Sequence, residues 1–195
     1  MRAYANYKAC YLLSFGTLCL LAWLSPFVAQ AENYSAEVKA ADVTIQGERI
    51  VLSADISYRL SPKTREALQN GVPLFWIVHI KTKQVRPFLW NKTLTEVALS
   101  YRLQYHALLN MYRVSNESGD EMHNFSTLAG ALDSMSTLRN LSIIDKAAIA
   151  PEQKIIVELN IVFDRDALPL PLRPIAYMDR QWYLSSDKTV WQLKK

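Results

Sequence analysis

Two aspartates at the end of a predicted strand are the nearest approach to a catalytic group in this sequence. Asp164 and Asp166 lie two residues apart, and a close pair of carboxyl groups is what general acid–base hydrolysis requires. Charged residues at strand ends produce the same pattern, so a hydrolase is the least favoured hypothesis here. The sequence has no G-x-S-x-G motif and no glycine-rich phosphate loop. We therefore predict that the protein is not an enzyme.

The histidines and their acidic neighbours do not form a recognisable metal-binding motif. His79, His106 and His123 lack the i, i+4 spacing of a helical zinc site. Asp120 and Glu121 precede His123 in one polar segment, which we expect to be an exposed loop. The whole chain contains five glycines, too few for a loop that wraps a cofactor. We therefore expect neither a metal ion nor another cofactor.

Aromatic and arginine side chains on predicted strands are better suited to binding than to catalysis. Such side chains bury a large area at a low entropic cost and dominate protein–protein recognition. The partner-binding surface that we predict consists of Trp90, Tyr101, Arg102, Tyr105 and His106. Alternating aromatic residues also form core and cross-strand pairs, and that interpretation stays open. A second hypothesis places a small apolar or lipidic ligand in a cavity lined by Trp76, Val78 and Leu103.

The elements that position these residues are clearest between residues 50 and 80. Apolar and polar residues alternate over 50–60, which predicts a strand with one buried face. Ser61 and Pro62 then predict the start of a helix that ends before Gly71. Residues 74–80 are apolar apart from one histidine, which predicts a central strand covered on both sides.

Similar patterns continue along the rest of the chain. Alternation predicts further strands at residues 41–46, 93–105, 108–115 and 155–163, and a last short strand or pair near the C-terminus. Helical spacing over 128–138 predicts a second helix, capped by Ser126 or Asn124. The proline-rich segment 168–174 predicts extended, polyproline-like chain, either a rigid loop or a partner-binding segment.

These elements predict a mainly β fold with two short helices. We expect an antiparallel β-sandwich or an α+β domain, and the alternative is a single curved sheet with both helices on one face. The domain is expected to cover residues 41–195, after a mobile lead-in at 32–40.

The N-terminal segment has the features of an export signal. Basic residues and an apolar stretch come first, and Ala29 and Ala31 then form a small-x-small motif that predicts cleavage between Ala31 and Glu32. We therefore predict a signal peptide over residues 1–31, followed by export to the periplasm of a Gram-negative bacterium. The alternative is an uncleaved signal that anchors the protein in the inner membrane, and we expect membrane contact only in that case.

The exported chain has little charge and no cysteine. Loss of Arg2 and Lys8 with the signal lowers the formal net charge from +4 to +2, too little and too scattered for nucleic-acid binding. Both cysteines, Cys10 and Cys19, leave with the signal. Stability must therefore come from core burial and not from disulfides.

Several strings along the chain resemble a known family. They are LSADISYRLSPKTREALQNGVPLFW, YRLQYHALLNMYRVS, FSTLAGAL, LPLPLRPIAY and WYLSSD. They resemble a family of exported proteobacterial proteins that is catalogued as a domain of unknown function, with members labelled proline-rich signal-peptide proteins. The likeness spans roughly residues 41–187. It implies a Gram-negative envelope protein that is encoded beside envelope-sensing kinases, and it implies no known catalytic residue.

We therefore expect a non-enzymatic periplasmic domain that binds an envelope or membrane protein, such as the outer domain of a sensor kinase. The alternative is a carrier that holds a small apolar or lipidic ligand inside the β-sandwich.

Overall fold

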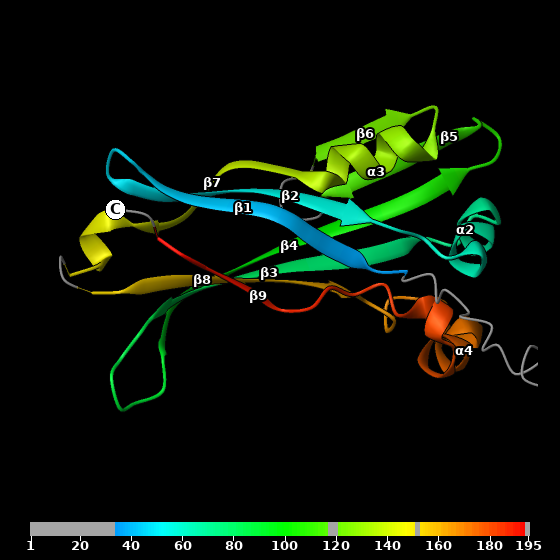
Figure 1. The fold of residues 1–195 in the computed structure, drawn as a ribbon. Coiled ribbons are helices and arrows are strands. Elements are labelled where there is room, and N and C mark those ends of the chain that lie inside the picture. Colours follow the sequence, from blue (N-terminus) through cyan, green and yellow to red (C-terminus); the bar gives the residue numbers. More distant parts are fainter. Residues whose placement is uncertain (1–33, 117–120, 151–152, 194–195) are drawn as a thin grey trace, which may run out of the picture. The chain divides into compact units, whose positions relative to one another are not determined.

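The computed structural model describes residues 34–116, 121–150 and 153–193, and the strands of this part of the chain form two antiparallel sheets (Figure 1). The strands of the smaller sheet are β1 (Ala36–Gln46), β2 (Arg49–Tyr58) and β7 (Thr137–Asp145), in the order β1-β2-β7. The strands of the larger sheet are β3 (Leu74–Gln84), β4 (Lys92–His106), β5 (Met111–Asn116), β6 (Glu121–Phe125), β8 (Ile155–Phe163) and β9 (Thr189–Gln192). Their order is β6-β5-β4-β3-β8-β9. The predicted mainly β fold is confirmed, and the alternative of a single sheet is wrong.

Strand β2 shows how the alternating sequence produces a one-sided core. The side chains of Ile50, Leu52 and Ala54 are buried, whereas Ser53 and Asp55 between them are half-exposed. Successive side chains of a strand point to opposite faces, so the apolar set faces the second sheet and the polar set faces solvent. This strand matches its prediction.

The larger sheet also has one buried face. On β3 the residues Leu74, Trp76 and Val78 are fully buried, while Phe75 and Ile77 between them are half-exposed. The prediction that both faces of this strand are covered is therefore wrong. The strand is central because β4 and β8 pair with its two edges. The apolar residues on the outer face of β3 are half-exposed, and no second layer within the described part of the chain covers them fully.

Three short α-helices accompany the sheets in the described part of the chain. Helix α2 (Pro62–Gln69) begins where predicted, because the Ser61 hydroxyl accepts a hydrogen bond from the Thr64 N–H. In helix α3 (Leu128–Ser136) the cap is Thr127, whose hydroxyl accepts from the Gly130 N–H. The predicted caps, Ser126 and Asn124, do not fill this role.

Helix α4 (Arg173–Met178) lies where the sequence predicts extended chain. A 3₁₀ turn at Leu170–Leu172 leads into it, and another at Arg180–Trp182 follows it. Proline is well tolerated in the first turn of a helix, because its missing N–H has no helical partner there. The prolines of this segment therefore open helical turns, and the polyproline-like prediction is wrong.

Other elements also differ from prediction. Strand β5 begins at Met111 and not at residue 108, and β7 lies where no strand was predicted. Strand β1 begins at Ala36, so residues 36–40 of the predicted lead-in belong to the first sheet. Strand β5 reaches Asn116 and β6 begins at Glu121, so most of the predicted polar loop at 116–124 is a strand pair. Residues 117–120 lie outside the described part, as do the predicted signal peptide and its cleavage site between Ala31 and Glu32.

One hydrophobic core lies between the two sheets. Asn33–Lys195 forms one compact unit, and buried side chains from both sheets and all three helices form a single cluster. Two hydrogen bonds also connect strands of the smaller sheet to other parts of the domain. The Ala36 N–H donates to the Leu184 carbonyl at 3.1 Å, and the Thr95 hydroxyl donates to the Ile143 carbonyl at 3.0 Å.

Candidate functional site

The five residues predicted to bind a partner do not form one surface. Trp90 lies in the connection between β3 and β4 and is 90% exposed. Lys92, where β4 begins, is separated from Tyr101 by about 30 Å of strand at ~3.3 Å per residue. On β4, Tyr101 shares the inward face with the buried Leu103, and Arg102 lies on the opposite face. Tyr105 likewise lies on the inward face of β4, and His106 lies on the outer face.

Two of the β4 members, Arg102 and Tyr105, have structural partners. Tyr105 stacks against Tyr112 of β5 with ring centroids 4.8 Å apart, and its hydroxyl donates to Asn110 Oδ1 at 2.7 Å. The Arg102 guanidinium lies 5.6 Å from the centre of the Phe75 ring. These contacts are the cross-strand pairs that the sequence left open as the second interpretation. Of the five predicted residues, Trp90 is exposed and the other four are half-exposed.

The three residues predicted to line a ligand cavity lie in the core. Trp76, Val78 and Leu103 are fully buried on the inner face of the larger sheet. The Trp76 ring lies 5.6 Å from Tyr58 across the core and 5.2 Å from Phe163 on β8, centroid to centroid.

Three buried donors in this aromatic cluster lack a hydrogen-bond partner among the described residues. They are Tyr58 OH, Trp76 Nε1 and Trp182 Nε1. Trp182 belongs to the cluster because its ring lies 6.3 Å from Phe163. Burial, with a smaller contribution from Tyr101, raises the pKa of the Tyr58 hydroxyl, so this group stays protonated and remains a donor. Unpaired buried donors are uncommon and call for an acceptor.

The aspartate pair is used to shape a loop. Asp164 Oδ1 accepts hydrogen bonds from the N–H groups of Asp166 at 2.9 Å and Ala167 at 3.2 Å. Asp166 Oδ1 accepts from the Tyr177 hydroxyl at 2.7 Å, and this bond raises the pKa of Tyr177. Both carboxylates therefore have structural roles in the segment that precedes α4.

The histidines are dispersed over the sheet. His79 and His106 are half-exposed on the outer faces of β3 and β4, and His123 lies exposed on β6. His79 Nδ1 is 3.7 Å from Glu96 Oε1. Among the described residues, no three His, Cys, Asp or Glu side chains lie close enough together to hold a metal ion.

The structure reveals an exposed apolar surface around α4, of which the sequence indicated only the proline-rich segment 168–174, with partner binding as one of two interpretations. We call it the C-terminal platform, and it consists of Leu170, Ile175, Tyr177, Met178 and Tyr183. Met178 is 87% exposed and Leu170 is 73% exposed. The available signal was the apolar run after Pro174, which continues a helix that the proline can begin.

The platform is held in place by aromatic and polar contacts. The Arg165 guanidinium lies 4.5 Å from the centre of the Tyr177 ring and 4.8 Å from that of Tyr183. The Tyr183 hydroxyl donates to the Tyr177 carbonyl at 3.0 Å. Cation–π contacts and hydrogen bonds of this kind fix the orientation of the two tyrosine side chains.

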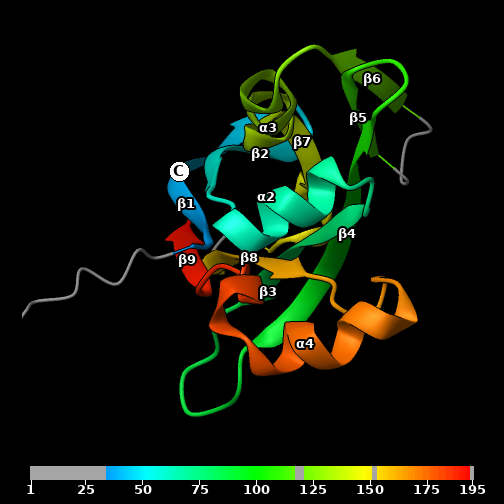
Figure 2. The same ribbon diagram turned by 90° about the vertical axis from the view of Figure 1, so that its right-hand side faces the viewer.

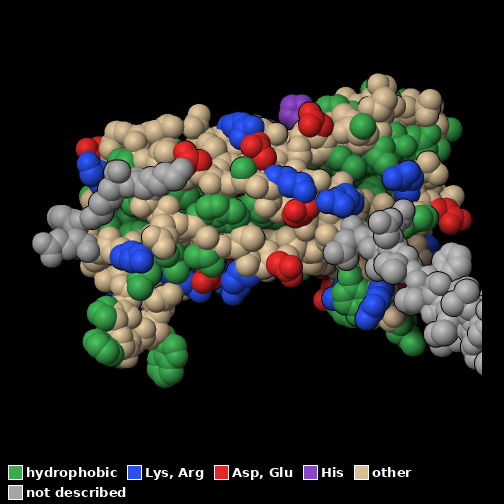
Figure 3. Space-filling model, in the orientation of Figure 1, with side chains coloured by type: hydrophobic (Ala, Val, Ile, Leu, Met, Phe, Trp, Pro, Cys, Tyr) green, Lys and Arg blue, Asp and Glu red, His purple; other side chains and the backbone are tan. Residues whose placement is uncertain are grey.

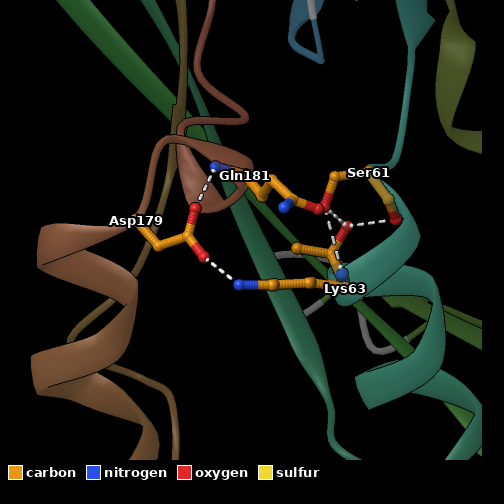
Figure 4. A network of polar contacts seen from close by, with 5 residues as sticks. Ser61, Lys63, Asp179 and Gln181 are labelled. Atoms are coloured by element: carbon orange, nitrogen blue, oxygen red, sulfur yellow. Dashed lines mark hydrogen bonds and ion pairs between the residues drawn. The ribbon is translucent and has the colours of Figure 1, made fainter.

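An ion pair fastens the platform to α2 (Figure 4). Lys63 Nζ lies 2.5 Å from Asp179 Oδ2, and Asp179 Oδ1 accepts from the Gln181 N–H at 3.0 Å. The hydrogen bond from Lys63 is the main cause that lowers the pKa of Asp179. Two segments more than 100 residues apart in sequence are joined here.

A second exposed surface lies at the end of the β3–β4 hairpin. We call it the hairpin tip, and it consists of Phe88, Leu89 and Trp90, of which Phe88 is 103% exposed. The Arg86 guanidinium donates to the Trp90 carbonyl from Nε at 3.0 Å and from Nη2 at 2.8 Å. The β3–β4 hairpin projects from the domain, and Figure 3 shows hydrophobic side chains at its end. Only Trp90 of the tip was among the predicted binding residues.

These features define an antiparallel two-sheet domain with two exposed apolar surfaces. No helix in the described part of the chain is long and apolar enough to cross a membrane. The chain belongs to the family named Domain of unknown function (DUF4390), whose family model matches residues 33–192. This confirms the resemblance to a family of unknown function. Comparisons with curated proteins and with solved structures gave no match.

Proposed function

We propose that this protein is an exported, non-enzymatic domain of the Gram-negative envelope that binds another envelope protein through the C-terminal platform. The observation that carries this proposal is the exposed apolar side chains around α4, held by Arg165 and by the ion pair between Lys63 and Asp179. Contiguous exposed apolar surface on a soluble domain marks a place of interaction. The predicted export signal and the resemblance in sequence support the periplasmic location.

The composition of the platform favours a protein partner. Tyr, Met and Arg are enriched at the centres of protein interfaces, and here they lie together. Residues 164–180 contain three arginines and three aspartates, so charges of both signs surround the apolar side chains. A mixed pattern can match complementary charges on a protein surface and specify one partner. Its rigid arrangement reduces the entropy lost on binding. An outer domain of a sensor kinase is the partner that the family resemblance implies.

We predict that Ile175→Asp combined with Met178→Asp abolishes partner binding. Each change places a charge in the apolar contact, and together they should weaken the complex at least about 100-fold. The measurement is native mass spectrometry of the protein purified gently from its own envelope. The natural protein should carry a stoichiometric protein partner, and the double variant should not.

The matched control is Leu108→Asp combined with Leu109→Asp in the β4–β5 turn, where both leucines are exposed. This variant should retain the partner. Retention of the partner by the platform variant, or its loss from both variants alike, would contradict the assignment to the platform.

A carrier function is a second proposal, favoured by the three unpaired donors in the core. A small apolar ligand with an acceptor group could satisfy Tyr58 OH, Trp76 Nε1 and Trp182 Nε1, which lie within one aromatic cluster. The apolar remainder of such a ligand would contact Val78 and Leu103 of the predicted lining.

We predict for the carrier that Tyr58→Phe weakens ligand binding about tenfold, because one buried hydrogen bond is lost while the ring remains. Native mass spectrometry should detect a small added mass that denaturation removes. Tyr105→Phe is the control, since the Tyr105 hydroxyl bonds to Asn110 in the β4–β5 turn. A natural protein without any such mass would end the carrier proposal.

A further inference from the structure

The hairpin tip differs from the platform in its isolation. In Figure 1 the β3–β4 connection extends away from both sheets, and Figure 3 shows its apolar side chains at the far end. Phe88 and Trp90 have almost no contact with the rest of the domain, as their exposures of 103% and 90% show. Large apolar side chains in this position contribute little to folding, and three of them gathered at one apex indicate contact with something outside the domain.

The tip is also held in a defined conformation. The two hydrogen bonds from Arg86 to the Trp90 carbonyl close the loop across its base. Phe88 has a positive φ of 64°, a conformation that is uncommon for a bulky residue. Unfavourable backbone conformations persist where the surrounding structure enforces them, and they occur often at functional sites. The loop therefore presents Phe88, Leu89 and Trp90 together at its apex.

The charge around the tip has one sign. Residues 81–92 contain four basic residues and no acidic residue. Lys81 and Lys83 pair with Glu96 and Glu158 of the neighbouring strands. Arg86 and Lys92 form no ion pair with any described residue, so their positive charge directly behind the apolar apex is not neutralised there.

This arrangement matches the boundary between lipid headgroups and acyl chains. Trp favours that boundary because its amphipathic ring sits at the level of the headgroups. Phe and Leu bury their apolar side chains at the edge of the acyl region. Lys and Arg behind them reach the anionic headgroups, each contributing attraction to a negatively charged surface. The platform lacks this separation, because arginines and aspartates alternate around it. The exposed Leu108 and Leu109 lack it too, since residues 103–112 contain no Lys or Arg.

We propose that the hairpin tip docks the domain on a membrane containing anionic phospholipids, with Phe88, Leu89 and Trp90 inserted at the headgroup boundary and Arg86 and Lys92 at the phosphates. This contact is separate from the predicted signal segment. The sequence predicts membrane contact only through that segment, when it stays uncleaved. It is also independent of the protein-binding proposal, because it uses different residues.

The first test measures partition of the full chain onto vesicles of phosphatidylethanolamine and phosphatidylglycerol in equal parts. Replacing all three tip residues by serine should lower the partition coefficient at least about 100-fold, because three apolar side chains no longer leave water. Lys92→Gln should lower it about fivefold on these vesicles. On vesicles of phosphatidylcholine alone, Lys92→Gln should have no effect.

The matched control is the pair Leu108→Ser and Leu109→Ser, which removes equally exposed apolar side chains from the β4–β5 turn. This control should bind as the natural chain does. An equal loss from the control, or unchanged partition of the serine variant of the tip, would overturn the proposal.

The second test distinguishes the tip from an uncleaved signal, which every variant shares. Lipids brominated on the acyl chains quench the fluorescence of tryptophans that enter the membrane. Trp90→Phe keeps an apolar ring, so this variant should bind normally but lose a large part of the quenching. Trp76 and Trp182 are buried and should contribute little. Equal quenching in Trp90→Phe and in the natural chain would show that Trp90 stays in water, and the proposal would then be wrong.

Discussion

Replacing Trp76 by alanine is expected to lower the free energy of unfolding by about 3–5 kcal/mol. The Trp76 side chain is fully buried and its ring packs between Tyr58 of β2 and Phe163 of β8. It therefore joins the two sheets, and its removal leaves a cavity that the surrounding strands cannot close without losing their pairing. Urea unfolding followed by circular dichroism measures the effect. Since domains are stable by only about 5–15 kcal/mol, a large fraction of the stability is at stake.

The matched control is Phe88→Ala at the hairpin tip, where the aromatic ring is fully exposed. This change should alter the free energy of unfolding by less than about 0.5 kcal/mol. A loss below about 1 kcal/mol for Trp76→Ala would mean that the ring borders open space and not a packed core. That result would favour the carrier proposal, because the predicted lining residues would then surround a cavity.

Replacing Glu158 by glutamine is expected to lower the free energy of unfolding by about 1–3 kcal/mol, because a largely buried lysine loses its counter-charge. Glu158 Oε2 lies 2.8 Å from Lys83 Nζ and 3.6 Å from Lys188 Nζ. The side chains of Glu158 and Lys83 are only 12% and 19% exposed, so solvent screens this pair far less than the surface pairs. Glutamine keeps the shape but leaves Lys83 without its counter-charge.

The same carboxylate makes stability depend on pH. Burial alone raises the pKa of Glu158, but the hydrogen bond and charge of Lys83, with help from Lys188, lower it below its ordinary value of 4.5. The folded state therefore binds this proton less readily than the unfolded state does. Its contribution to stability is complete above pH 4.5 and is lost as the pH falls through the lowered value.

Melting temperatures measured between about pH 6 and pH 2 test this linkage. The natural protein should lose stability more steeply than Glu158→Gln across the acid range. Glu37→Gln is the control. The pKa of Glu37 is also lowered, chiefly by a hydrogen bond from Lys39, but the side chain lies at the surface. Solvent screens such a pair, so this variant should lose stability in acid nearly as the natural protein does. Equal acid sensitivity of the natural protein and Glu158→Gln would contradict the role assigned to this carboxylate.

The two proposed surfaces are compatible with one orientation at a membrane. The β3–β4 hairpin and α4 extend from the same side of the larger sheet in Figure 1, and the perpendicular view in Figure 2 agrees. A domain docked by its hairpin tip would therefore turn the platform toward the bilayer. A membrane protein that projects a short distance from the bilayer could then reach it. This orientation connects the two proposals, although each has its own test.

Local features of the sequence were enough to predict the elements whose causes are local. Alternation over residues 50–60 reflects a strand with one face in the core, and β2 matches it. Helix α2 begins at Pro62 because the side chain of Ser61 caps it. It ends before Gly71, which has a positive φ of 84°. The alternation of β4 already implied that Tyr101 and Arg102 point to opposite faces.

Other features depend on residues far apart in the sequence, and only the tertiary structure could decide them. The proline-rich sequence of α4 by itself suggested extended chain. The helix is stabilised by contacts with Lys63 of α2 and with Arg165, which lie outside the helix. Which apolar residues stay exposed is likewise a matter of packing. Trp76 and Trp90 have the same chemistry. Trp76 faces the second sheet and is buried, whereas Trp90 lies at the tip of a hairpin and its side chain is exposed. Burial depends on the surrounding elements, and for that reason the two exposed surfaces became visible only in the folded chain.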